Sequence, residues 1–347
     1  MQPWASCHYF ILFPPGRRGF PESRHALDAA SRMVSGGQMK RRDFVRIASA
    51  GLGLAPALRA AEGLGAPTAS APSIRFGYAA ITWGGNDRQA IADVADLGFP
   101  GIQLRSNVLQ EFGDKPAALK ELLQANDLKM VALSSGGVSV TTRPEEEFVK
   151  HERHAAFVRA VGGMYLQVTD QLPPGRPATA ADRRVLGERL TEIGKRIADV
   201  GVPLGYHNHM NSLGERPNEV DDILAAADPR YVRLELDVAH YTQGGGDPVK
   251  AIDRHHDRLL FLHLKDVEPV PPAPGADPAR AYRFVELGRG RVDLPGVFAA
   301  LKRAGFKGWA VVELDAVPDK ARTPKESAQI SKSYLERQGF RIEGGGP

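Results

Sequence analysis

Short apolar runs alternate with longer amphipathic stretches from about residue 72 onward. The apolar runs are rich in β-branched residues and predict strands over residues 74–81, 101–105, 129–133, 164–168, 203–209, 231–237, 259–264 and 309–313. Apolar positions at helical spacing predict helices over residues 88–97, 115–126, 145–161, 182–200, 220–227, 248–254, 294–304 and 325–338. Glycine closes several of these helices before the next strand, as at Gly98, Gly201 and Gly305.

This alternation predicts a parallel sheet, because each helix carries the chain back to the start of the next strand. Eight repeats over about 270 residues match a closed (β/α)8 TIM barrel, an α/β fold whose catalytic groups lie at the C-terminal ends of the strands. The rival is an open doubly wound sheet. Its first turn usually carries a glycine-rich fingerprint, and residues 82–86 lack that spacing. We therefore predict a single barrel domain over residues 72–343.

One segment departs from the regular pattern of the barrel. Residues 270–281, after the seventh predicted strand, are rich in proline and too long for a minimal strand-to-helix loop. We expect a surface insertion or lid there, with a disordered loop as the alternative.

The first 71 residues have the features of a leader. Met39 opens the sequence MKRRDFV, followed by a moderately apolar run over residues 47–58 and then small residues, the layout of a twin-arginine export signal. The run is shorter than the roughly 20 residues of a membrane-spanning helix. We predict a signal peptide and linker over residues 39–71, a periplasmic or secreted protein and no stable membrane anchor. Residues 1–38 are predicted to be an unstructured upstream extension; the alternative is a basic leader with a chance arginine pair.

The excess of basic residues in the chain lies in the leader. The whole sequence carries 45 basic and 41 acidic residues, a balance that by itself suggests an anionic partner. Residues 1–71 hold nine of the basic and four of the acidic residues, so the other 276 are close to neutral. We therefore expect no nucleic acid partner. The only cysteine, Cys7, also lies in the leader, which excludes disulfides, cysteine-bound zinc and a cysteine nucleophile from the barrel.

Polar side chains gather at the predicted ends of the last four strands. In chain order they are His207, His209, Glu235, Asp237, His240, His263, Lys265, Glu313 and Asp315. In a barrel these ends meet, so we expect one pocket. Any one of these residues alone would be interpreted as a hydrogen-bonded barrel residue. Imidazoles and carboxylates together, without thiolates, suit Mn²⁺, Co²⁺, Mg²⁺ or Zn²⁺, and the ligand set that we predict is His207, Asp237, His263 and Glu313.

Two other polar groups are less specific. His255 and His256 lie in a charged helical stretch, which is typical of a solvated helix face. The two arginines of residues 288–291 could hold an anionic group of a substrate, or they could belong to a polar turn. The sequence leaves both interpretations open.

Several segments resemble a known superfamily. They are AITWGGND (80–87), YHNH (206–209), LDVAH (236–240), LHLKDV (262–267), LGRGRVD (287–293) and GWAVVE (308–313). They are similar to the xylose isomerase-like sugar phosphate isomerase/epimerase superfamily of TIM barrels, most of all to its inosose dehydratase-like members. The resemblance covers residues 74–337. It implies a divalent metal at the strand ends, held by Asp237, His263 and Glu313, and a sugar or cyclitol substrate. It also implies that His240 and Lys265 contact substrate or handle protons.

Two positions depart from the pattern of that superfamily. Its epimerases usually have a glutamate on the fifth strand, where this chain has His207. Its dehydratase-like members tend to have an acidic residue on the fourth strand, where this chain has Gln167. Gln167 can bind a substrate hydroxyl but cannot act as a base, so a relay between two glutamates is not expected.

The resemblance implies proton abstraction next to a carbonyl, with an enediolate intermediate stabilised by a metal. We expect Glu313 or His207 as the base and Lys265 or His240 as its acid partner. The predicted substrate-binding residues are Trp83, Gln103, Arg105, Gln167, His209 and Glu235.

The sequence leaves the reaction open. The leading prediction is a sugar isomerase or epimerase, and the alternative is a lyase that eliminates a β-hydroxyl from a keto-sugar or keto-inositol. A metal-dependent phosphodiesterase and a non-catalytic sugar-binding barrel are weaker alternatives, the former because it would need a basic face for DNA. A homo-oligomer is compatible with the sequence.

Overall fold

A computed structural model describes residues 74–342 of the chain. The predicted upstream extension, signal peptide and Cys7 lie outside these residues, so the export route stays a prediction. Within residues 74–342, none of the helices is long and apolar enough to cross a membrane.

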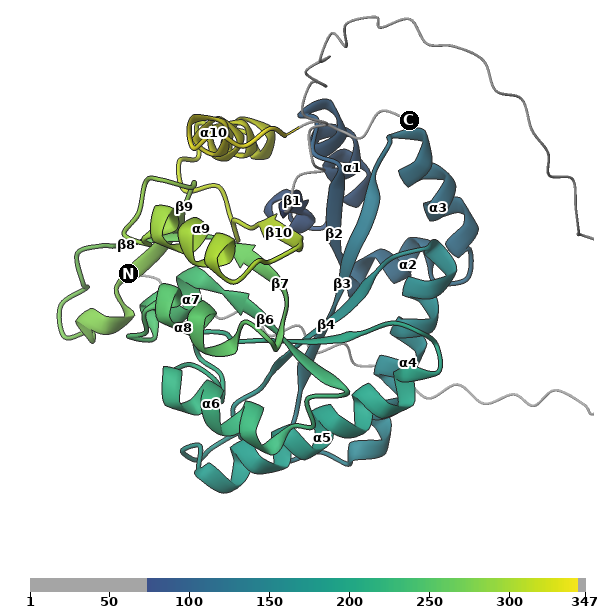
Figure 1. The fold of residues 1–347 in the computed structure, drawn as a ribbon, viewed down its shortest axis with the longest axis vertical. Coiled ribbons are helices and arrows are strands. Elements are labelled where there is room, and N and C mark those ends of the chain that lie inside the picture. Colours follow the sequence, from purple (N-terminus) through teal and green to yellow (C-terminus); the bar gives the residue numbers. More distant parts are fainter. Residues whose placement is uncertain (1–73, 343–347) are drawn as a thin grey trace, which may run out of the picture. The chain divides into compact units, whose positions relative to one another are not determined.

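Eight parallel strands close into a barrel, in the spatial order β1-β10-β7-β6-β5-β4-β3-β2. Their bounds are β1 (Ile74–Ala79), β2 (Gly101–Arg105), β3 (Lys129–Val138), β4 (Tyr165–Asp170), β5 (Leu204–His207), β6 (Val232–Asp237), β7 (Leu259–Leu264) and β10 (Gly308–Val312). Figure 1 shows these strands at the centre and the helices around them. The predicted single TIM barrel is therefore confirmed.

The helices lie on the outside of the barrel (Figure 1). They are α1 (Asp87–Asp96), α2 (Leu109–Phe112), α3 (Pro116–Ala125), α4 (Pro144–Val161), α5 (Ala180–Ala198), α6 (Pro217–Ala226), α7 (Val238–Gln243), α8 (Pro248–His255), α9 (Leu294–Arg303) and α10 (Pro324–Arg337). Local sequence sets their first turns. Thr179 and Asp182 form a capping box at α5, Thr323 and Glu326 form another at α10, and proline opens α3, α4 and α6, where its missing N–H costs no hydrogen bond.

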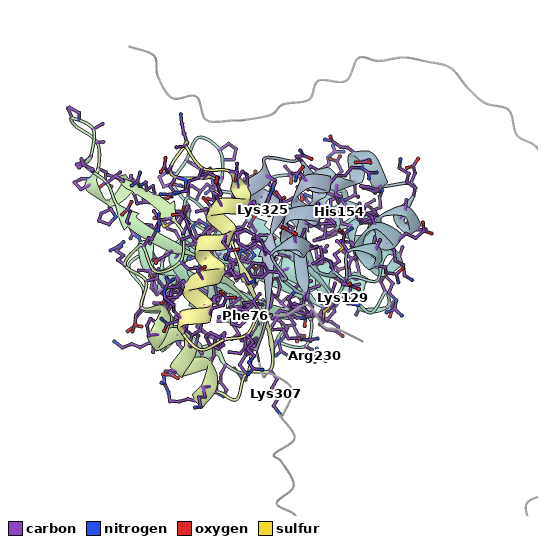
Figure 2. The ribbon with its side chains drawn as sticks, turned by 90° about the horizontal axis from the view of Figure 1, so that it is seen from above. Phe76, Lys129, His154, Arg230, Lys307 and Lys325 are labelled. Carbon is purple, nitrogen blue, oxygen red and sulfur yellow. The ribbon has the colours of Figure 1, made fainter. Side chains whose placement is uncertain are left out.

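Apolar side chains fill the barrel below the site. Tyr165 and Phe261 stack inside it with ring centroids 5.2 Å apart. A Cβ at Gly101 would lie 2.4 Å from the ring of Trp309, so only glycine fits there. After α10 the ring of Phe340 packs 4.9 Å from that of Phe76 on β1, and Figure 2 shows α10 in front of this part of the barrel. With its interior packed, the barrel can bind a ligand only near its mouth.

The eight predicted strands are all present. The features that were not predicted include the helices α2 and α7, a bulge in β3 and a hairpin. The ladder between β3 and β4 shifts register between Ser134 and Gly137, a bulge that lets β3 run on to Val138. A two-stranded antiparallel hairpin, β8 (Asp266–Pro269) and β9 (Tyr282–Val285), follows β7. The proline-rich segment 270–281 is the tip of that hairpin, as a surface insertion, and contains the short helix η3 (Pro278–Arg280).

Candidate active site

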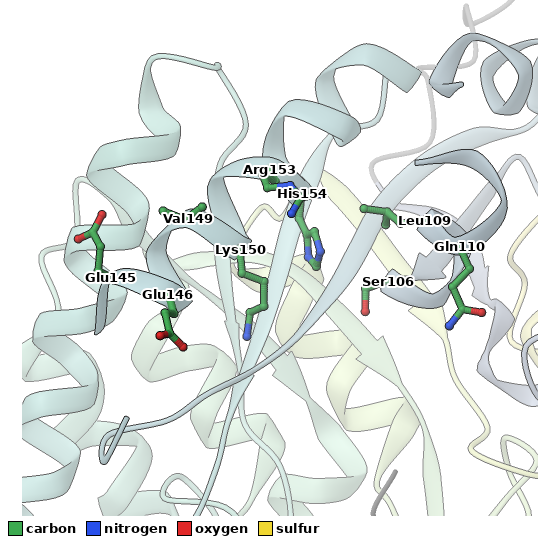
Figure 3. Close-up of a pocket in the computed structure, with 9 residues that line it drawn as sticks. All are labelled: Ser106, Leu109, Gln110, Glu145, Glu146, Val149, Lys150, Arg153 and His154. Atoms are coloured by element: carbon green, nitrogen blue, oxygen red, sulfur yellow. The ribbon is translucent and has the colours of Figure 1, made fainter. Parts of the chain in front are cut away.

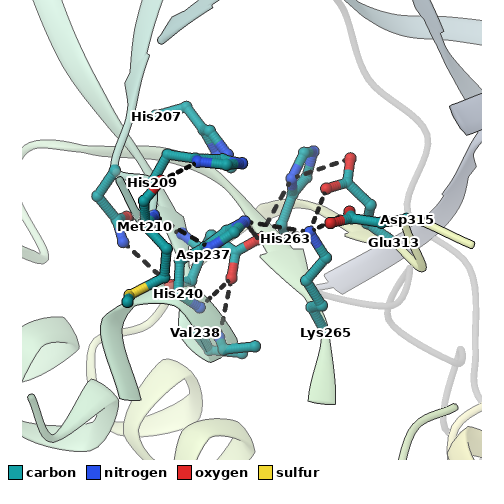
Figure 4. A network of polar contacts seen from close by, with 12 residues as sticks. His207, His209, Met210, Asp237, Val238, His240, His263, Lys265, Glu313 and Asp315 are labelled. Atoms are coloured by element: carbon teal, nitrogen blue, oxygen red, sulfur yellow. Dashed lines mark hydrogen bonds and ion pairs between the residues drawn. The ribbon is translucent and has the colours of Figure 1, made fainter. Parts of the chain in front are cut away.

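The polar residues that end the last four barrel strands come together in one buried cluster (Figure 4). His207 ends β5, Asp237 ends β6 and His263 lies near the end of β7, while Lys265 and Glu313 directly follow β7 and β10. Each of these five side chains is at most 8% exposed. The predicted convergence of the strand ends is therefore what the structure shows.

Asp237 presents one free carboxylate oxygen to this cluster. Its Oδ1 accepts hydrogen bonds from the backbone N–H groups of Ala239 and His240, both at 2.8 Å, so Asp237 caps α7. The side chain of Asn208 bonds both the N–H and the C=O of Asp237 and fixes its backbone. Oδ2 is buried and has no hydrogen-bond partner among the described residues. Burial raises the pKa of Asp237, but Lys265, His263 and His207 together hold it below its usual value, so the carboxylate is ionised.

His263 faces two carboxylates with one ring nitrogen. Its Nε2–H donates to Oε1 of Gln103 at 2.8 Å. Its Nδ1 lies 3.7 Å from Oδ2 of Asp237 and 3.4 Å from Oε2 of Glu313 and makes no hydrogen bond. Burial lowers the pKa of His263, and Glu235 and Glu313 raise it well above its usual range. In the metal-free protein these carboxylates therefore favour a proton on Nδ1, the position that a cation would take.

These atoms fit a divalent cation. Asp237, His263 and Glu313 each offer a ligand atom, and the three atoms lie within 4.8 Å of one another. Two of them, Oδ2 of Asp237 and Nδ1 of His263, are buried without a hydrogen-bond partner, which is costly unless a cation or proton binds there. One imidazole and two carboxylates suit Mn²⁺, Co²⁺ or Zn²⁺.

Two neighbouring groups fit a cation less well. His207, Glu235 and His263 also come within 4.8 Å, but that group would need Nε2 of His263, which already donates to Gln103. His207, His209 and His240 form the other group. In it, Nδ1 of His240 accepts from the backbone N–H of Met210, and Nε2 lies 3.2 Å from the Lys265 ammonium. His207, predicted as a fourth ligand, therefore lies beside the favoured group.

Lys265 is a buried ammonium held by carboxylates. Its Nζ donates to Oε1 of Glu313 at 2.7 Å and lies 2.6 Å from Oδ1 of Asp315. The ring of Phe284, on β9, covers the ammonium with its centroid 4.3 Å away. Burial lowers the pKa of Lys265, but Asp315 and Glu313 raise it far above its usual value. Lys265 therefore stays charged and is a weak proton donor.

The rings of His209 and His240 are in contact, with centroids 3.8 Å apart and the ring planes tilted by 39°. Nδ1 of His209 donates to the backbone oxygen of Met210 at 2.6 Å. Burial, then the charge of His207, lowers the pKa of His209. Burial and Lys265 lower the pKa of His240 well below its usual range. Both rings are neutral at pH 7, and the bond to Met210 leaves Nε2 of His209 without a proton.

A cavity of about 310 Å³ opens beside the cluster. It is lined by Ala79, Ile81, Gln103, Arg105, Ser134, Gly136, Gly137, Gln167, Thr169, His207, His209, Glu313 and Asp315. Gln103, Arg105, Gln167 and His209, which we predicted to bind substrate, are therefore at its wall.

Two other predicted substrate residues lie elsewhere. The indole N–H of Trp83 donates to Asp93 at 2.8 Å, and its ring packs edge-on against Tyr78. Glu235 is fully buried and is not among the lining residues.

Asp315 and Phe284 take part in this cluster without having been predicted as site residues. Asp315 follows Glu313 at the spacing that returns to the same face of an extended strand, and that was the available signal. Phe284 gave no signal, because its position over Lys265 depends on a hairpin that was not predicted.

Other polar groups and cavities lie away from this cluster. Arg291 donates to Gln243 at 2.7 Å, and Asp266 accepts from the backbone N–H groups of Gly288 and Gly290. Residues 288–291 therefore form a polar turn whose hydrogen bonds go to other residues of the protein. A second cavity, of about 610 Å³, is lined by residues of α2 and α4 together with Ser106, and Figure 3 shows His154 and Lys150 at its wall. None of the predicted site residues lines it.

Comparison with known proteins places this geometry in context. The family model described as xylose isomerase-like TIM barrel matches residues 91–337. The rhizopine catabolism protein MocC of Rhizobium meliloti is 27% identical, over 78% of this chain and 91% of that protein. Inosose dehydratase of Lacticaseibacillus casei is also 27% identical, over 76% of this chain and 97% of that enzyme.

Solved structures share the fold at lower identity. The IOLI protein with a bound zinc atom has a TM-score of 0.62 at 19% identity, covering 76% of this chain and 97% of that one. D-allulose 3-epimerase from Methylomonas sp. has a TM-score of 0.61 at 20% identity, covering 76% of this chain and 98% of that one. At these identities the likeness establishes the barrel alone.

Proposed function

Because this chain belongs to the xylose isomerase-like TIM barrel family, we propose that it is a divalent-metal-dependent dehydratase of a keto-inositol or keto-sugar. It removes the proton next to the carbonyl and eliminates the β-hydroxyl as water. The relatives named inosose dehydratase, which match over most of their length, support this reaction.

One observation carries the proposal: unbonded, buried ligand atoms of Asp237 and His263 meet Oε2 of Glu313. Glu313 itself lines a cavity large enough for a six-membered ring. A divalent cation held there would act as a Lewis acid on the substrate carbonyl. Its identity is open among Mn²⁺, Co²⁺, Mg²⁺ and Zn²⁺, and the zinc atom of the IOLI structure supports a site of this kind.

The imidazoles at the cavity wall are the groups that we propose to move protons. His207 and His209 both line the cavity, and a neutral imidazole is an effective base near pH 7. His263 and Lys265 hold the pKa of Glu313 well below its usual range, against the effect of burial. We therefore propose that Glu313 binds the metal and holds the Lys265 ammonium, and that His207 is the base.

The arrangement favours elimination over epimerisation. The rings of His207 and His209 lie side by side, with centroids 5.7 Å apart. His207 can remove the proton as a base and then, as an imidazolium, return that proton to the departing hydroxyl on the same side. An epimerase instead needs proton-moving groups on both faces of one carbon, and the carboxylates here are occupied by Lys265 or by ligand positions.

An isomerase or epimerase is the second candidate, on a separate observation. Glu313 and His207 both line the cavity and end strands that are separated by β7 and β6. Two groups could thus approach a substrate from different sides. D-allulose 3-epimerase, among the structures that share the fold, is compatible with this reading.

A single experiment distinguishes these reactions. The purified protein, loaded with Mn²⁺, Co²⁺ or Zn²⁺, is incubated in D₂O with keto-inositols and keto-sugars, and the products are followed by NMR. The proposal predicts a dehydrated product, formed only with metal and lost in Asp237→Ala. Isomerised or epimerised products would select the second candidate, and a ligand that binds without deuterium exchange would indicate a non-catalytic sugar-binding barrel.

We also propose that residues 39–71 direct export by the twin-arginine route. The arginine pair and the short apolar run support this. N-terminal sequencing of the mature protein from the periplasm should find the leader removed, and a cytoplasmic protein that retains residues 39–71 would contradict the proposal.

A further inference from the structure

Glu235 is a buried carboxylate for which the reaction so far has no use. It lies on β6, two residues before Asp237, so both side chains point to the same side of the strand. It is fully buried, does not line the cavity, and neither of its oxygens makes a well-aligned hydrogen bond.

Each oxygen of Glu235 faces a different imidazole. Oε1 lies 2.7 Å from Nε2 of His263, and Oε2 lies 3.4 Å from Nδ1 of His207. A ring nitrogen without a proton would be repelled by a carboxylate oxygen 2.7 Å away. Nε2 of His263 also donates to Oε1 of Gln103, so both neighbouring oxygens favour a proton on that nitrogen.

The same reasoning applies to His207. Its Nδ1 is buried and has no hydrogen-bond partner within residues 74–342, and Oε2 of Glu235 is an acceptor that faces it. A proton on Nδ1 leaves Nε2 as the lone-pair nitrogen of a ring that lines the cavity. One carboxylate thus orients two imidazoles in opposite senses.

We propose that Glu235 is a positioning residue that acts through His207 and His263. It keeps the proton of His263 on Nε2, so that Nδ1 faces Asp237 and Glu313 as a ligand. It keeps the proton of His207 on Nδ1, so that Nε2 faces the cavity as a proton acceptor. Carboxylates that orient metal-binding histidines in this way raise metal affinity by about 10–100-fold. The inference rests on the proposed metal site.

The substitution Glu235→Gln separates this role from a packing role. Glutamine has nearly the same shape but only one acceptor oxygen, so it cannot accept a proton from both imidazoles. Its amide N–H₂ donates instead, and the proton of His207 should move to Nε2. The Tm of the Zn²⁺-loaded variant checks that the fold is retained.

The test combines two measurements on full-length protein. Two-bond ¹H–¹⁵N NMR of the Zn²⁺-loaded protein, labelled at histidine, should place the protons on Nε2 of His263 and Nδ1 of His207. Competition with a chromophoric chelator should show Zn²⁺ affinity lower by about 10–100-fold in Glu235→Gln. Glu286→Gln is the matched control, because Glu286 is a buried carboxylate bonded to Arg322 and Ser327, away from the cluster, and it should change neither quantity.

Wild-type affinity and unchanged histidine protons in Glu235→Gln would overturn the proposal. It would equally be overturned by a wild-type spectrum in which Nε2 of His263 binds the zinc, because Glu235 would then be a direct ligand. A wild-type protein that binds no Zn²⁺, Mn²⁺ or Co²⁺ would instead contradict the proposed function. In that case the position of the His207 proton in the metal-free protein would still decide the role of Glu235.

Discussion

The mouth of the barrel has two unlike halves. The half formed by β1 to β4 lines the cavity with amides, hydroxyls and glycine backbone, and Arg105 is the charged residue it contributes. The half formed by β5, β6, β7 and β10 holds the imidazoles, the carboxylates and Lys265. The first half suits the hydroxyl groups of a polyol, and the second holds a cation and moves protons. Substrate recognition and chemistry are thus divided between two sets of strands. We call β1 to β4 the neutral half of the mouth, and β5, β6, β7 and β10 the charged half.

The contrast extends to how each half is built. In the charged half, side chains are fixed by one another: Lys265 bridges Glu313 and Asp315, and Asp237 caps α7. In the neutral half, the register shift in β3 between Ser134 and Gly137 shapes the wall, and bulges of this kind commonly re-aim side chains near active sites. Substitutions in the two halves should therefore have different consequences.

The largest effect is expected from removing a ligand in the charged half. Asp237→Ala should abolish stoichiometric metal binding and lower turnover by about three orders of magnitude, because charge that develops on the substrate loses its main stabilisation. Chelator competition and steady-state kinetics measure the two effects. Thr169→Val, at the opposite wall, is the control and should bind metal like the wild type. Full activity in Asp237→Ala would contradict the assignment of metal binding to the charged half.

Metal removal should weaken the protein as well as inactivate it. A cation at 100 times its dissociation constant stabilises the native state by about 2.7 kcal/mol, so EDTA should lower Tm and Zn²⁺ or Mn²⁺ should restore it. The same treatment of Asp237→Ala should leave Tm unchanged. A shift of equal size in both proteins would show that the cation binds elsewhere.

One residue of the neutral half is hydrogen-bonded to a metal ligand of the charged half and offers a sharper test. Gln103 comes from β2 but accepts the Nε2–H of His263 at 2.8 Å. Gln103→Leu should therefore lower metal affinity by about tenfold, an effect typical of residues that orient a ligand. Thr169→Val, on β4, is the control and should leave metal affinity unchanged; Gln167 is unsuitable because its side chain accepts a hydrogen bond from Gln103. Equal metal affinities in the two variants would mean that Gln103 does not orient His263 and serves only the neutral half.

The pH dependence of activity should reflect the neutral imidazoles. Burial lowers the pKa of His209 from its usual 6.5, so this ring beside the base His207 stays neutral below that pH and adds no charge to the cavity wall. Protonation of His209 should therefore contribute no acidic limb to kcat/KM at pH 6.5 or above. An acidic limb centred above pH 6.5 would mean that a group with a raised pKa controls the reaction.

The smallest effect is expected from a single hydroxyl in the neutral half. Thr169→Val keeps the shape of the side chain and removes one hydrogen-bonding group, which typically contributes about 1 kcal/mol. KM should rise several-fold with kcat unchanged. A fall in kcat of a hundredfold or more would assign Thr169 to the chemistry.

The two halves also differ in how far the sequence predicted them. Period-two alternation places His263 with Lys265 and Glu313 with Asp315 at strand ends, so the charged half could be predicted once eight repeats indicated a barrel. Which nitrogen of His263 faces the carboxylates depends on Gln103, distant in the chain, and no local pattern contains that information. The prediction that Trp83 binds substrate failed in a similar way. The motif 80–87 drew attention to Trp83, but no local pattern shows that its indole N–H bonds Asp93.

The neutral half and the hairpin were harder to predict because their positions arise from packing. The bulge in β3 shows in the sequence only as Gly136 and Gly137, and β8 and β9 are four residues each around a proline-rich tip. Phe284 reaches Lys265 only because that hairpin folds over the site.

Titration of the metal-free protein with Co²⁺, followed by its visible absorption, tests the central claim most directly. We predict one equivalent bound with a spectrum of mixed nitrogen and oxygen ligation, its loss in Asp237→Ala and His263→Ala, and its retention in His207→Ala. No saturable spectrum in the wild type, or a spectrum that survives both Asp237→Ala and His263→Ala, would contradict the account.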